Sequence, residues 1–303
     1  MSTSSHTRTA LGLTFVGLAA AAAGNTASGA NLANVNLTNG LKAYWNLDEA
    51  SGTTVFDSAP GGVADNANFA TNAAQMPTRI LNGVVAGALS FDGGDAVAIA
   101  KSTDLDINAN QLTISLWVNA ASFPASGANR SIFDSVNDQY VVYQDGTNKE
   151  LRFKVTTGNG AARPGIPMAS LANNTWVHVV GVFDGAAAGG TGTASIYLNG
   201  ALADTHTGDD TSHVGLNTNV NAGQIAAIGA QPSSATINPP NAFTTPFTGS
   251  VDEIAVWNRV LNPDEIAYLY NGGAGNAVAA PEPGSLAALA AAAAPLLLRR
   301  RRR

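Results

Sequence analysis

Residues Phe247 to Gly272 are the stretch that most constrains the fold, because strand, turn and helix signals follow one another there without ambiguity. From Val251 to Trp257 the side chains alternate as a period-two strand requires, and this alternation puts Asp252 on the same face as apolar residues. A carboxylate that faces a core is costly unless it accepts hydrogen bonds or binds a cation. We therefore expect a buried strand in which Asp252 has a hydrogen-bonded or metal-binding role.

A short helix is predicted directly after this strand. The signals are an N-cap, a proline at the first helical position, a capping-box glutamate and two apolar residues on one face, at Asn262, Pro263, Glu265, Ile266 and Leu269. Gly272 supplies the stop. The segment is therefore expected to be a closing strand followed by a small helix that packs against it.

Short stretches of strand pattern, separated by turns rich in Gly and Asn, fill most of the remaining chain. Leu112 to Asn119 alternates apolar with semi-polar residues, and Leu151 to Val155 alternates apolar residues with cations, so its second side faces water. Trp176 to Phe183 is apolar on both faces apart from His178, which predicts a central strand. The Asn199-Gly200 pair between two strand patterns predicts a hairpin. These signals predict an all-β sandwich of two antiparallel sheets with a short C-terminal helix.

Composition limits the classes of function. The chain has 303 residues, of which 45% are hydrophobic, so it can bury a sizeable core. It contains no cysteine, which excludes disulfides, thiolate catalysis and cysteine-ligated zinc. Residues 31–280 contain 9 Lys and Arg against 20 Asp and Glu, a net charge of −11 (9 − 20). This field repels phosphate backbones, so we expect no nucleic-acid partner.

The same stretches resemble the blocks of a known family. The final strand and helix, from Gly249 to Tyr270, look like the C-terminal signature of bacterial laminin-G-like domains of the concanavalin A-like lectin/glucanase superfamily. The other matching blocks, in the family's order, are LKAYWNLDEASGTTVFDSAPGG (41–62), ALSFDGGDAVAI (88–99), LTISLWVNA (112–120), TWVHVVGVFDG (175–185) and ASIYLNGAL (194–202). The resemblance implies a concanavalin A-like jelly roll and leaves the ligand open.

The two ends of the chain have the composition of sorting signals. Residues 1–30 resemble a secretory signal peptide, with Arg8 in a polar start and then an apolar run from Ala10 to Ala23. The other end has three parts, Pro281-Glu282-Pro283, an apolar run at 286–298 and five arginines at 299–303, and it is similar to the PEP-CTERM tails that an exosortase recognises. We therefore expect a signal peptide at 1–30, a sandwich at 31–275 and a sorting tail at 276–303.

This layout predicts an exported protein of the cell envelope, cell surface or extracellular matrix of a Gram-negative bacterium. The apolar run at 286–298 is shorter than the roughly 20 residues that span a bilayer, while the arginines behind it would stay on the cytoplasmic side. Contact with the membrane is therefore expected only through this transient tail.

Calcium is the metal that the sequence suggests. The family's turn pattern after the first strand often includes an oxygen-ligated structural calcium, and this chain keeps Asp57 but departs from the pattern at 59–62. We expect Asp57 and Asp252 to be ligands, with Asn66 as a further oxygen donor.

The strand patterns argue against a glucanase. Such an enzyme needs two carboxyl groups that enter one cleft, so they must lie at alternating positions of a strand. Asp252 and Glu253 are adjacent and are expected to project to opposite faces. His178 has neither a nucleophile nor metal-ligand spacing beside it, so we expect a structural role for it.

A non-catalytic surface or matrix module is therefore the main hypothesis, with a polysaccharide or a surface glycoprotein as its partner. Trp117, Tyr140 and Tyr143 offer flat apolar faces for sugar rings, and the alternative for each is to fill the core. Two other hypotheses stay open. One is a secreted glycoside hydrolase or lyase with loop-borne carboxylates, for which the candidates are Asp134, Asp138 and Asp145, and the other is a purely structural matrix protein.

Overall fold

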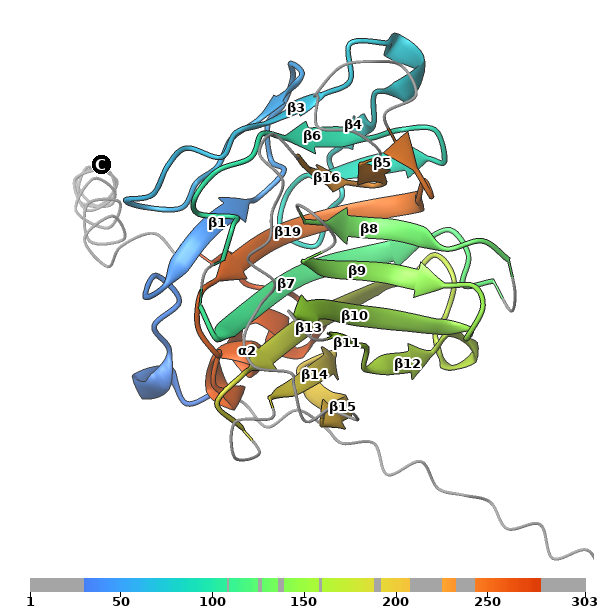
Figure 1. The fold of residues 1–303 in the computed structure, drawn as a ribbon. Coiled ribbons are helices and arrows are strands. Elements are labelled where there is room, and N and C mark those ends of the chain that lie inside the picture. The colour runs from blue at the N-terminus through green and yellow to red at the C-terminus, as the bar shows by residue number, and fades with distance from the viewer. Residues whose placement is uncertain are drawn as a thin grey trace, which may run out of the picture.

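Two large antiparallel sheets face each other in the computed structural model, which describes residues 30–107, 109–124, 127–135, 139–157, 160–187, 192–207, 225–232 and 243–278. Strands β8, β9 and β10 lie in front of β7, β13 and β19 in Figure 1. The predicted all-β sandwich is confirmed. No helix in the described ranges is long and apolar enough to cross a membrane.

The first sheet has eight strands within the described residues. In spatial order they are β15 (Ala201–Thr207), β14 (Thr193–Leu198), β13 (Trp176–Asp184), β7 (Gln111–Ala120), β19 (Thr248–Trp257), β5 (Ala88–Asp92) and β4 (Thr78–Ile80), and β1 (Leu41–Trp45) also pairs with β19. β1 and β5 occupy the two halves of one edge of β19, while β7 lies along the other edge. The last long strand of the chain is therefore central in this sheet.

The second sheet has nine strands in the part of the chain that the structure covers. Their order is β11 (Gly160–Ala162), β10 (Glu150–Thr157), β9 (Tyr140–Asp145), β8 (Arg130–Asp134), β16 (Ala226–Ile228), β6 (Val97–Ile99), β3 (Ala67–Phe69) and β2 (Thr54–Val55), and β12 (Gly165–Pro167) pairs with β10. A small ladder joins β17 (Gln231–Pro232) to β18 (Phe243–Thr244). The short 3-10 turns are η1 (Leu32–Asn34), η2 (Ala73–Gln75), η4 (Met168–Ser170) and η5 (Asn271–Gly273).

The main core lies between the two sheets and follows the period-two patterns. The apolar residues of β7 and β10 that point inward are fully buried, namely Leu112, Ile114, Leu116, Val118, Leu151, Phe153 and Val155. Gly181 on β13 brings the sheets together, because a Cβ there would overlap the Phe153 ring. The alternation in the sequence thus decides which residues separate the layers.

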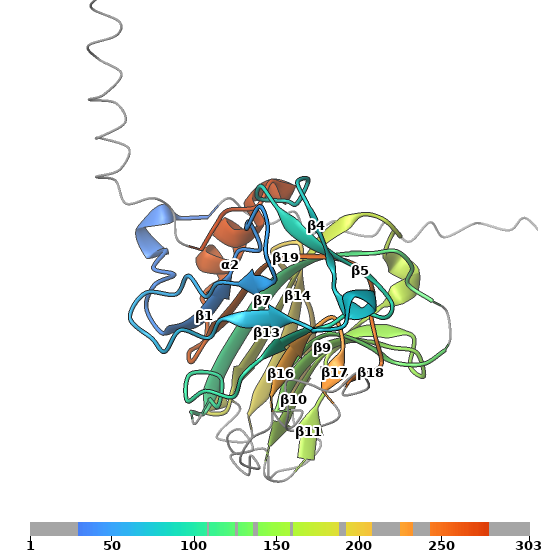
Figure 2. The ribbon, with the colours of Figure 1, turned by 90° about the horizontal axis from the view of Figure 1, so that it is seen from above.

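Helix α2 (Pro263–Tyr270) covers the outer side of the first sheet. Viewed from above, it lies beside β1, β7 and β19 and away from β10 and β11 (Figure 2). Its capping box is formed by Asn262 and Glu265, and Ile266 and Leu269 are buried in a second apolar cluster with Trp257. The helix predicted from the sequence is therefore confirmed, including its inner face.

A β-bulge in β19 changes the faces that the alternation predicted. Val251 pairs with Val118, the register shifts between Asp252 and Ala255, and Glu253 has a φ of 50°. An extra residue at a bulge reverses the side on which the following residues point. Val251 and Ile254 therefore face the main core, whereas Asp252 lies opposite Trp117 on the outer side.

This finding corrects two predictions about the same strand. Asp252 does not share the core face with Ile254 and Val256, and Asp252 and Glu253 do not point to opposite faces. Glu253 accepts a hydrogen bond from the Tyr44 hydroxyl at 2.7 Å, and Tyr44 belongs to the cluster beneath α2. Both carboxylates thus lie on the outer side of the first sheet, under the segments that cover it.

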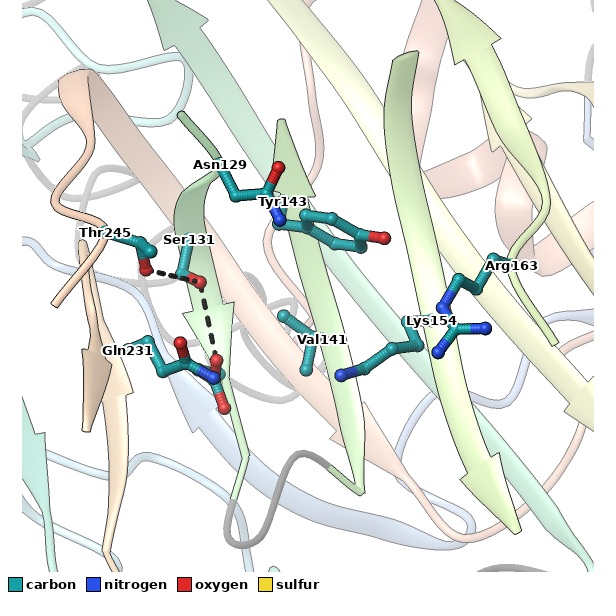
Figure 3. A pocket seen from close by; sticks show the side chains of 9 residues that line it. Asn129, Ser131, Val141, Tyr143, Lys154, Arg163, Gln231 and Thr245 are labelled. Carbon is teal, nitrogen blue, oxygen red and sulfur yellow. Dashed lines mark hydrogen bonds between the residues drawn. The ribbon is translucent and has the colours of Figure 1, made fainter. Parts of the chain in front are cut away.

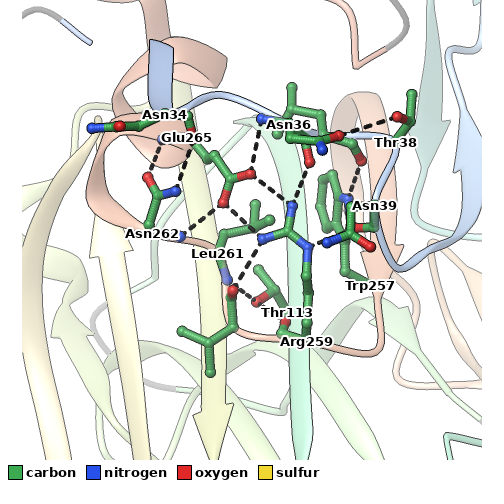
Figure 4. A network of polar contacts seen from close by, with 12 residues as sticks. Asn34, Asn36, Thr38, Asn39, Thr113, Trp257, Arg259, Leu261, Asn262 and Glu265 are labelled. Atoms are coloured by element: carbon green, nitrogen blue, oxygen red, sulfur yellow. Dashed lines mark hydrogen bonds and ion pairs between the residues drawn. The ribbon is translucent and has the colours of Figure 1, made fainter. Parts of the chain in front are cut away.

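The segment before β1 is fixed to α2 by one guanidinium group (Figure 4). Arg259 donates to both Glu265 oxygens at 2.8 and 2.7 Å and to the carbonyls of Asn36 and Asn39 at 2.7 and 2.6 Å. Glu265 also accepts from the backbone N–H of Asn36 and Asn262. Arg259 therefore has a structural role, because it joins the segment before β1 to the first turn of α2.

The predicted hairpin at Asn199-Gly200 is confirmed. β14 and β15 are joined by these two residues, whose φ angles of 52° and 78° are those of a type I′ turn. The predicted strand around His178 is also confirmed, because β13 lies between β14 and β7.

Candidate functional site

A pocket of about 210 Å³ opens on the outer face of the second sheet (Figure 3). It is lined by Asn129, Ser131, Asp134, Val141, Tyr143, Lys154, Arg163, Gln231 and Thr245. Three adjacent strands, β8, β9 and β10, supply its floor, and the segments around Arg163, Gln231 and Thr245 supply its rim. Most of the lining groups are therefore held by a hydrogen-bonded sheet.

A bulge in β8 brings two polar side chains to the floor. The register against β9 shifts between Ser131 and Phe133, so Ser131 pairs with Tyr143 and Asp134 pairs with Val141. Ile132 and Phe133 both enter the core, and Ser131 and Asp134 on either side of them both line the pocket. Without the extra residue, positions 131 and 134 would point to opposite faces.

Tyr143 forms the aromatic part of the floor. It is 8% exposed, so a small part of its surface is accessible from the pocket. Burial raises the pKa of its phenol, and the nearby Asp145 carboxylate acts in the same direction, while Arg152 and Arg163 oppose the shift. The hydroxyl therefore stays protonated and can donate as well as accept a hydrogen bond.

Thr245 closes one side of the pocket through strained backbone. Its carbonyl accepts from the Ser131 N–H at 2.9 Å, and its hydroxyl lies 3.4 Å from the Ser131 hydroxyl. The Ser131 hydroxyl also lies 3.4 Å from an Asp134 oxygen. Thr245 has a φ of 49°, a conformation that β-branched residues rarely adopt and that often marks a functional site.

The charges around the pocket are separated in space. Lys154 and Arg163 lie together on the β10 side, and Asn129, Ser131, Gln231 and Thr245 lie on the β8 side (Figure 3). The acidic group, Asp134, lies on β8 and is 1% exposed. The pocket therefore offers cationic donors at one end and hydroxyl, amide and carboxylate groups at the other.

The structure separates the three aromatic residues predicted to bind a ligand. Tyr140 is fully buried in the main core, where its ring stacks on Phe133 at 5.9 Å and its hydroxyl donates to the Leu105 carbonyl. Trp117 is 2% exposed, and its ring lies 5.9 Å from Tyr270 of α2. The prediction that these two rings stack on a sugar is wrong, because protein covers both. Tyr143 alone of the three lines the pocket.

The residues predicted to bind calcium do not form one site. Asp57 accepts from the backbone N–H groups of Tyr44, Ala59 and Asp65 at 2.9 to 3.1 Å, and the Asn66 side-chain oxygen accepts from the Asp57 N–H. Such N–H groups direct positive charge at the oxygens that a cation would need. These residues therefore suit a loop that backbone hydrogen bonds hold in place, and they do not suit a calcium site. Within the described residues, no group of three or more His, Asp or Glu side chains could hold a metal ion.

Asp252 has a hydrogen-bonded role. It accepts from the N–H groups of Val84 and Val85 at 2.7 and 3.1 Å and from Glu253 at 2.8 Å. Burial raises its pKa to about 7 despite these bonds, and burial likewise raises the pKa of Glu253 to about 8. Glu253 Oε1 has no hydrogen-bond partner among the described residues. Asp252 thus holds the loop at Val84 and Val85, and Glu253 holds the Tyr44 hydroxyl of β1.

His178 makes a buried contact with a serine and takes no part in the pocket. Its Nε2 lies 2.8 Å from the Ser115 hydroxyl, and burial lowers its pKa to about 3. Nδ1 has no partner in the described part of the chain, so no acid orients the ring. The structural role expected for His178 agrees with this environment.

The carboxylates proposed for an enzyme do not come together. Asp134 lies on β8 and not on a loop, and Asp145 accepts from Thr147 and Asn148 in the turn that follows β9. Asp134 pairs with Val141, four residues from Asp145, so the two backbones are about 13 Å apart. Asp138 lies outside the described residues.

Most of the pocket was not found from the sequence. The outward position of Lys154 follows from the β10 pattern, but nothing in the sequence places it beside Arg163. Gln231 and Thr245 reach the pocket from segments about 100 residues away from β8. The positive φ of Thr245 is a structural signal at the rim, and a sequence does not show it.

The fold is similar to several solved structures. These include the binding domain of botulinum neurotoxin serotype C1 (14% identity, TM-score 0.54) and the binding domain of serotype DC in complexes with rat synaptotagmin II and with SialylT (14% identity and TM-score 0.53 for each). Each match covers 78% of this chain and 52% of the other, so this chain spans about half the length of those structures.

Comparison with families and curated proteins completes the assignment. The chain matches no curated protein. A family model described as Concanavalin A-like lectin/glucanases superfamily matches residues 91–267, which include the floor of the pocket and the bulged strand β19. On this match and on its two-sheet architecture, the chain belongs to the concanavalin A-like lectin/glucanase superfamily.

Proposed function

We propose that this protein is a non-catalytic binding module whose pocket on the second sheet holds a carbohydrate. The observation that carries the proposal is the pocket itself, in which a phenol, two hydroxyls, two amides and two cations surround one cavity. Sugars present hydroxyl groups around apolar ring faces, and such a mixed lining can bind both.

The size of the pocket suits one unit of a larger ligand. Its volume of about 210 Å³ is below the roughly 300 to 1,000 Å³ of pockets that enclose drug-sized molecules. A polysaccharide can place one ring in it while its neighbours remain outside. Because β8, β9 and β10 fix the floor, little ordering is required on binding.

The similar structures are consistent with surface binding. The serotype DC domain is in complex with rat synaptotagmin II in one of these structures and with SialylT in another. At 14% identity these matches support the fold, and they supply a precedent for ligand binding on it.

The proposal includes the cellular context expected from the sequence. Residues 1–29 of the signal peptide, and Pro281, Glu282 and Pro283 of the tail, lie outside the described residues. Their sequences support an exported protein that an exosortase processes. A surface or matrix location would bring the pocket into contact with polysaccharides or glycoproteins.

A glycan array on the full chain tests the proposal. Tyr143→Ala removes the aromatic floor, so we expect affinity for the best glycan to fall about tenfold, or about 1.4 kcal/mol. Tyr197→Ala is the matched control, because Tyr197 is half-buried on β14 of the other sheet. Wild-type protein that binds no glycan, or equal binding by both variants, would contradict the proposal.

The same samples separate the other two hypotheses. Release of reducing ends from a polysaccharide panel would indicate a hydrolase, and new unsaturated ends would indicate a lyase. Neither binding nor turnover, together with self-association, would indicate a structural matrix protein.

A further inference from the structure

We propose that the pocket selects a carboxylate-bearing sugar unit and that Arg163 recognises its acidic group. This inference rests on the proposed function, because it names the ligand class of the same pocket. Its basis is the placement of Arg163 and Lys154 at one end of the pocket, across from the groups on β8.

Arg163 has donors to offer a ligand. Arg163 is an exposed residue, its guanidinium donates to the Ala161 carbonyl at 3.3 Å, and no ion pair holds it within the described residues. A guanidinium has five N–H donors in a planar fork that matches both oxygens of a carboxylate. One bond to a carbonyl leaves most of this fork available.

The backbone that carries Arg163 is fixed on both sides. β11 precedes it and pairs with β10 at Val155 to Thr157, while β12 follows it and pairs with β10 at Glu150 to Arg152. The Pro164 carbonyl also accepts from the Phe153 N–H at 3.2 Å. The guanidinium therefore extends from an anchored position, which lowers the entropy lost on binding.

The neighbouring Arg152 cannot serve the same purpose. It donates to Glu150 at 2.8 and 2.6 Å and lies 3.4 Å from an Asp145 oxygen. These two carboxylates neutralise it inside the fold. Of the two arginines beside Tyr143, Arg163 is the one that faces an incoming anion.

The opposite end of the pocket fixes the orientation. Asp134 would repel a carboxylate, whereas its oxygens, with the hydroxyls of Ser131 and Thr245, accept hydrogen bonds from sugar hydroxyls. An acidic sugar is therefore expected to place its carboxylate toward Arg163 and its hydroxyls toward β8.

The net charge of the whole chain restricts the class of ligand further. With 15 Lys and Arg against 21 Asp and Glu, the formal net charge is −6, and this field repels a dense polyanion. A polymer with isolated acidic units among neutral sugars avoids most of that repulsion. We expect such a polymer to bind more tightly than a heavily sulfated one.

Calorimetry on the full chain tests the inference with three ligands. These are an oligosaccharide with one uronic acid, the same molecule with its carboxyl group reduced to an alcohol, and a sulfated oligosaccharide. We expect the wild-type protein to bind the acid at least tenfold more tightly than the reduced form. Arg163→Gln should remove this preference, and Arg163→Lys should restore part of it.

Arg130→Gln is the control, because it makes the same charge change on the same sheet outside the pocket. It should keep the full preference. Equal wild-type affinity for the acid and the reduced form, or a preference that survives in Arg163→Gln, would overturn the inference and leave the proposed function standing. Binding of none of the ligands would contradict both, and a preference for the sulfated ligand would replace carboxylate with sulfate.

Discussion

The buried carboxyl groups of β19 predict that the sandwich becomes less stable as the pH rises above neutral. Burial raises the pKa of Asp252 to about 7 and that of Glu253 to about 8, above the unfolded values of 3.8 and 4.5. The folded protein therefore keeps both protons to higher pH than the unfolded chain does. This stabilising contribution is complete at low pH and is lost as the pH rises through the folded pKa values.

His178 determines the pH range in which this loss of stability can be measured. Its pKa falls from 6.5 to about 3 on folding, so it contributes stability above pH 6.5 and loses it as the pH falls. Below pH 6.5 this opposes the effect of the two carboxyl groups, and above pH 6.5 the contribution of His178 is nearly complete and the two carboxyl groups dominate the pH dependence. Between pH 6.5 and 8, the two pKa values predict a loss of about 2 kcal/mol in the free energy of unfolding.

Glu253→Gln should reduce this loss to about 1 kcal/mol, because the amide does not ionise and its oxygen can still accept from Tyr44. Urea unfolding at pH 6.5, 7 and 8 measures the slopes, and the wild-type melting temperature should fall by about 4 to 8 °C over the same range. Glu150→Gln, on the other sheet, should keep the wild-type slope. A wild-type stability that stays constant or rises from pH 6.5 to 8 would refute the reasoning.

Three further results are expected. Arg259→Met leaves Glu265, whose side chain is 2% exposed, without its cation. Urea unfolding should therefore show a loss of about 3 to 5 kcal/mol in the free energy of unfolding, and a loss below about 1 kcal/mol would contradict the structural role of Arg259. Gly181→Ala should cost about 1 to 3 kcal/mol because its Cβ overlaps Phe153, and the double variant with Phe153→Leu should recover part of that loss. Since N–H groups surround the Asp57 oxygens, chelator should not change the melting temperature; a calcium shift that Asp57→Asn abolishes would reinstate the calcium prediction.

Local signals in the sequence predicted the elements that short-range chemistry specifies. The capping box of Asn262 and Glu265 defines the start of α2, and Asn199-Gly200 defines the β14–β15 turn, because each depends on residues a few positions apart. The inward residues of β7 followed from alternation alone. These features do not depend on the rest of the fold.

The two bulges explain much of what the sequence did not predict. Alternation assumes one residue for each step along a strand, and the extra residues near Glu253 and Ile132 break that assumption. Tyr140 and Tyr143 show a second limit, since both are aromatic on one strand and only packing decides which ring enters the core. The pocket shows a third limit, because the contact between Thr245 and Ser131 of β8 joins residues that are far apart in the sequence.

The central position of β19 also affects how the protein is made. Trp45 in β1 pairs with Ile254 in β19, so more than 200 residues must be synthesised before that contact can form. At 5 to 20 residues per second, this takes about 10 to 40 s, during which β1 lacks its partner, and β5 and β7 lack the same partner from their own synthesis onward. Ribosome-bound chains that end before residue 248 should therefore be protease-sensitive and should recruit chaperones, and the sandwich should close in one late step.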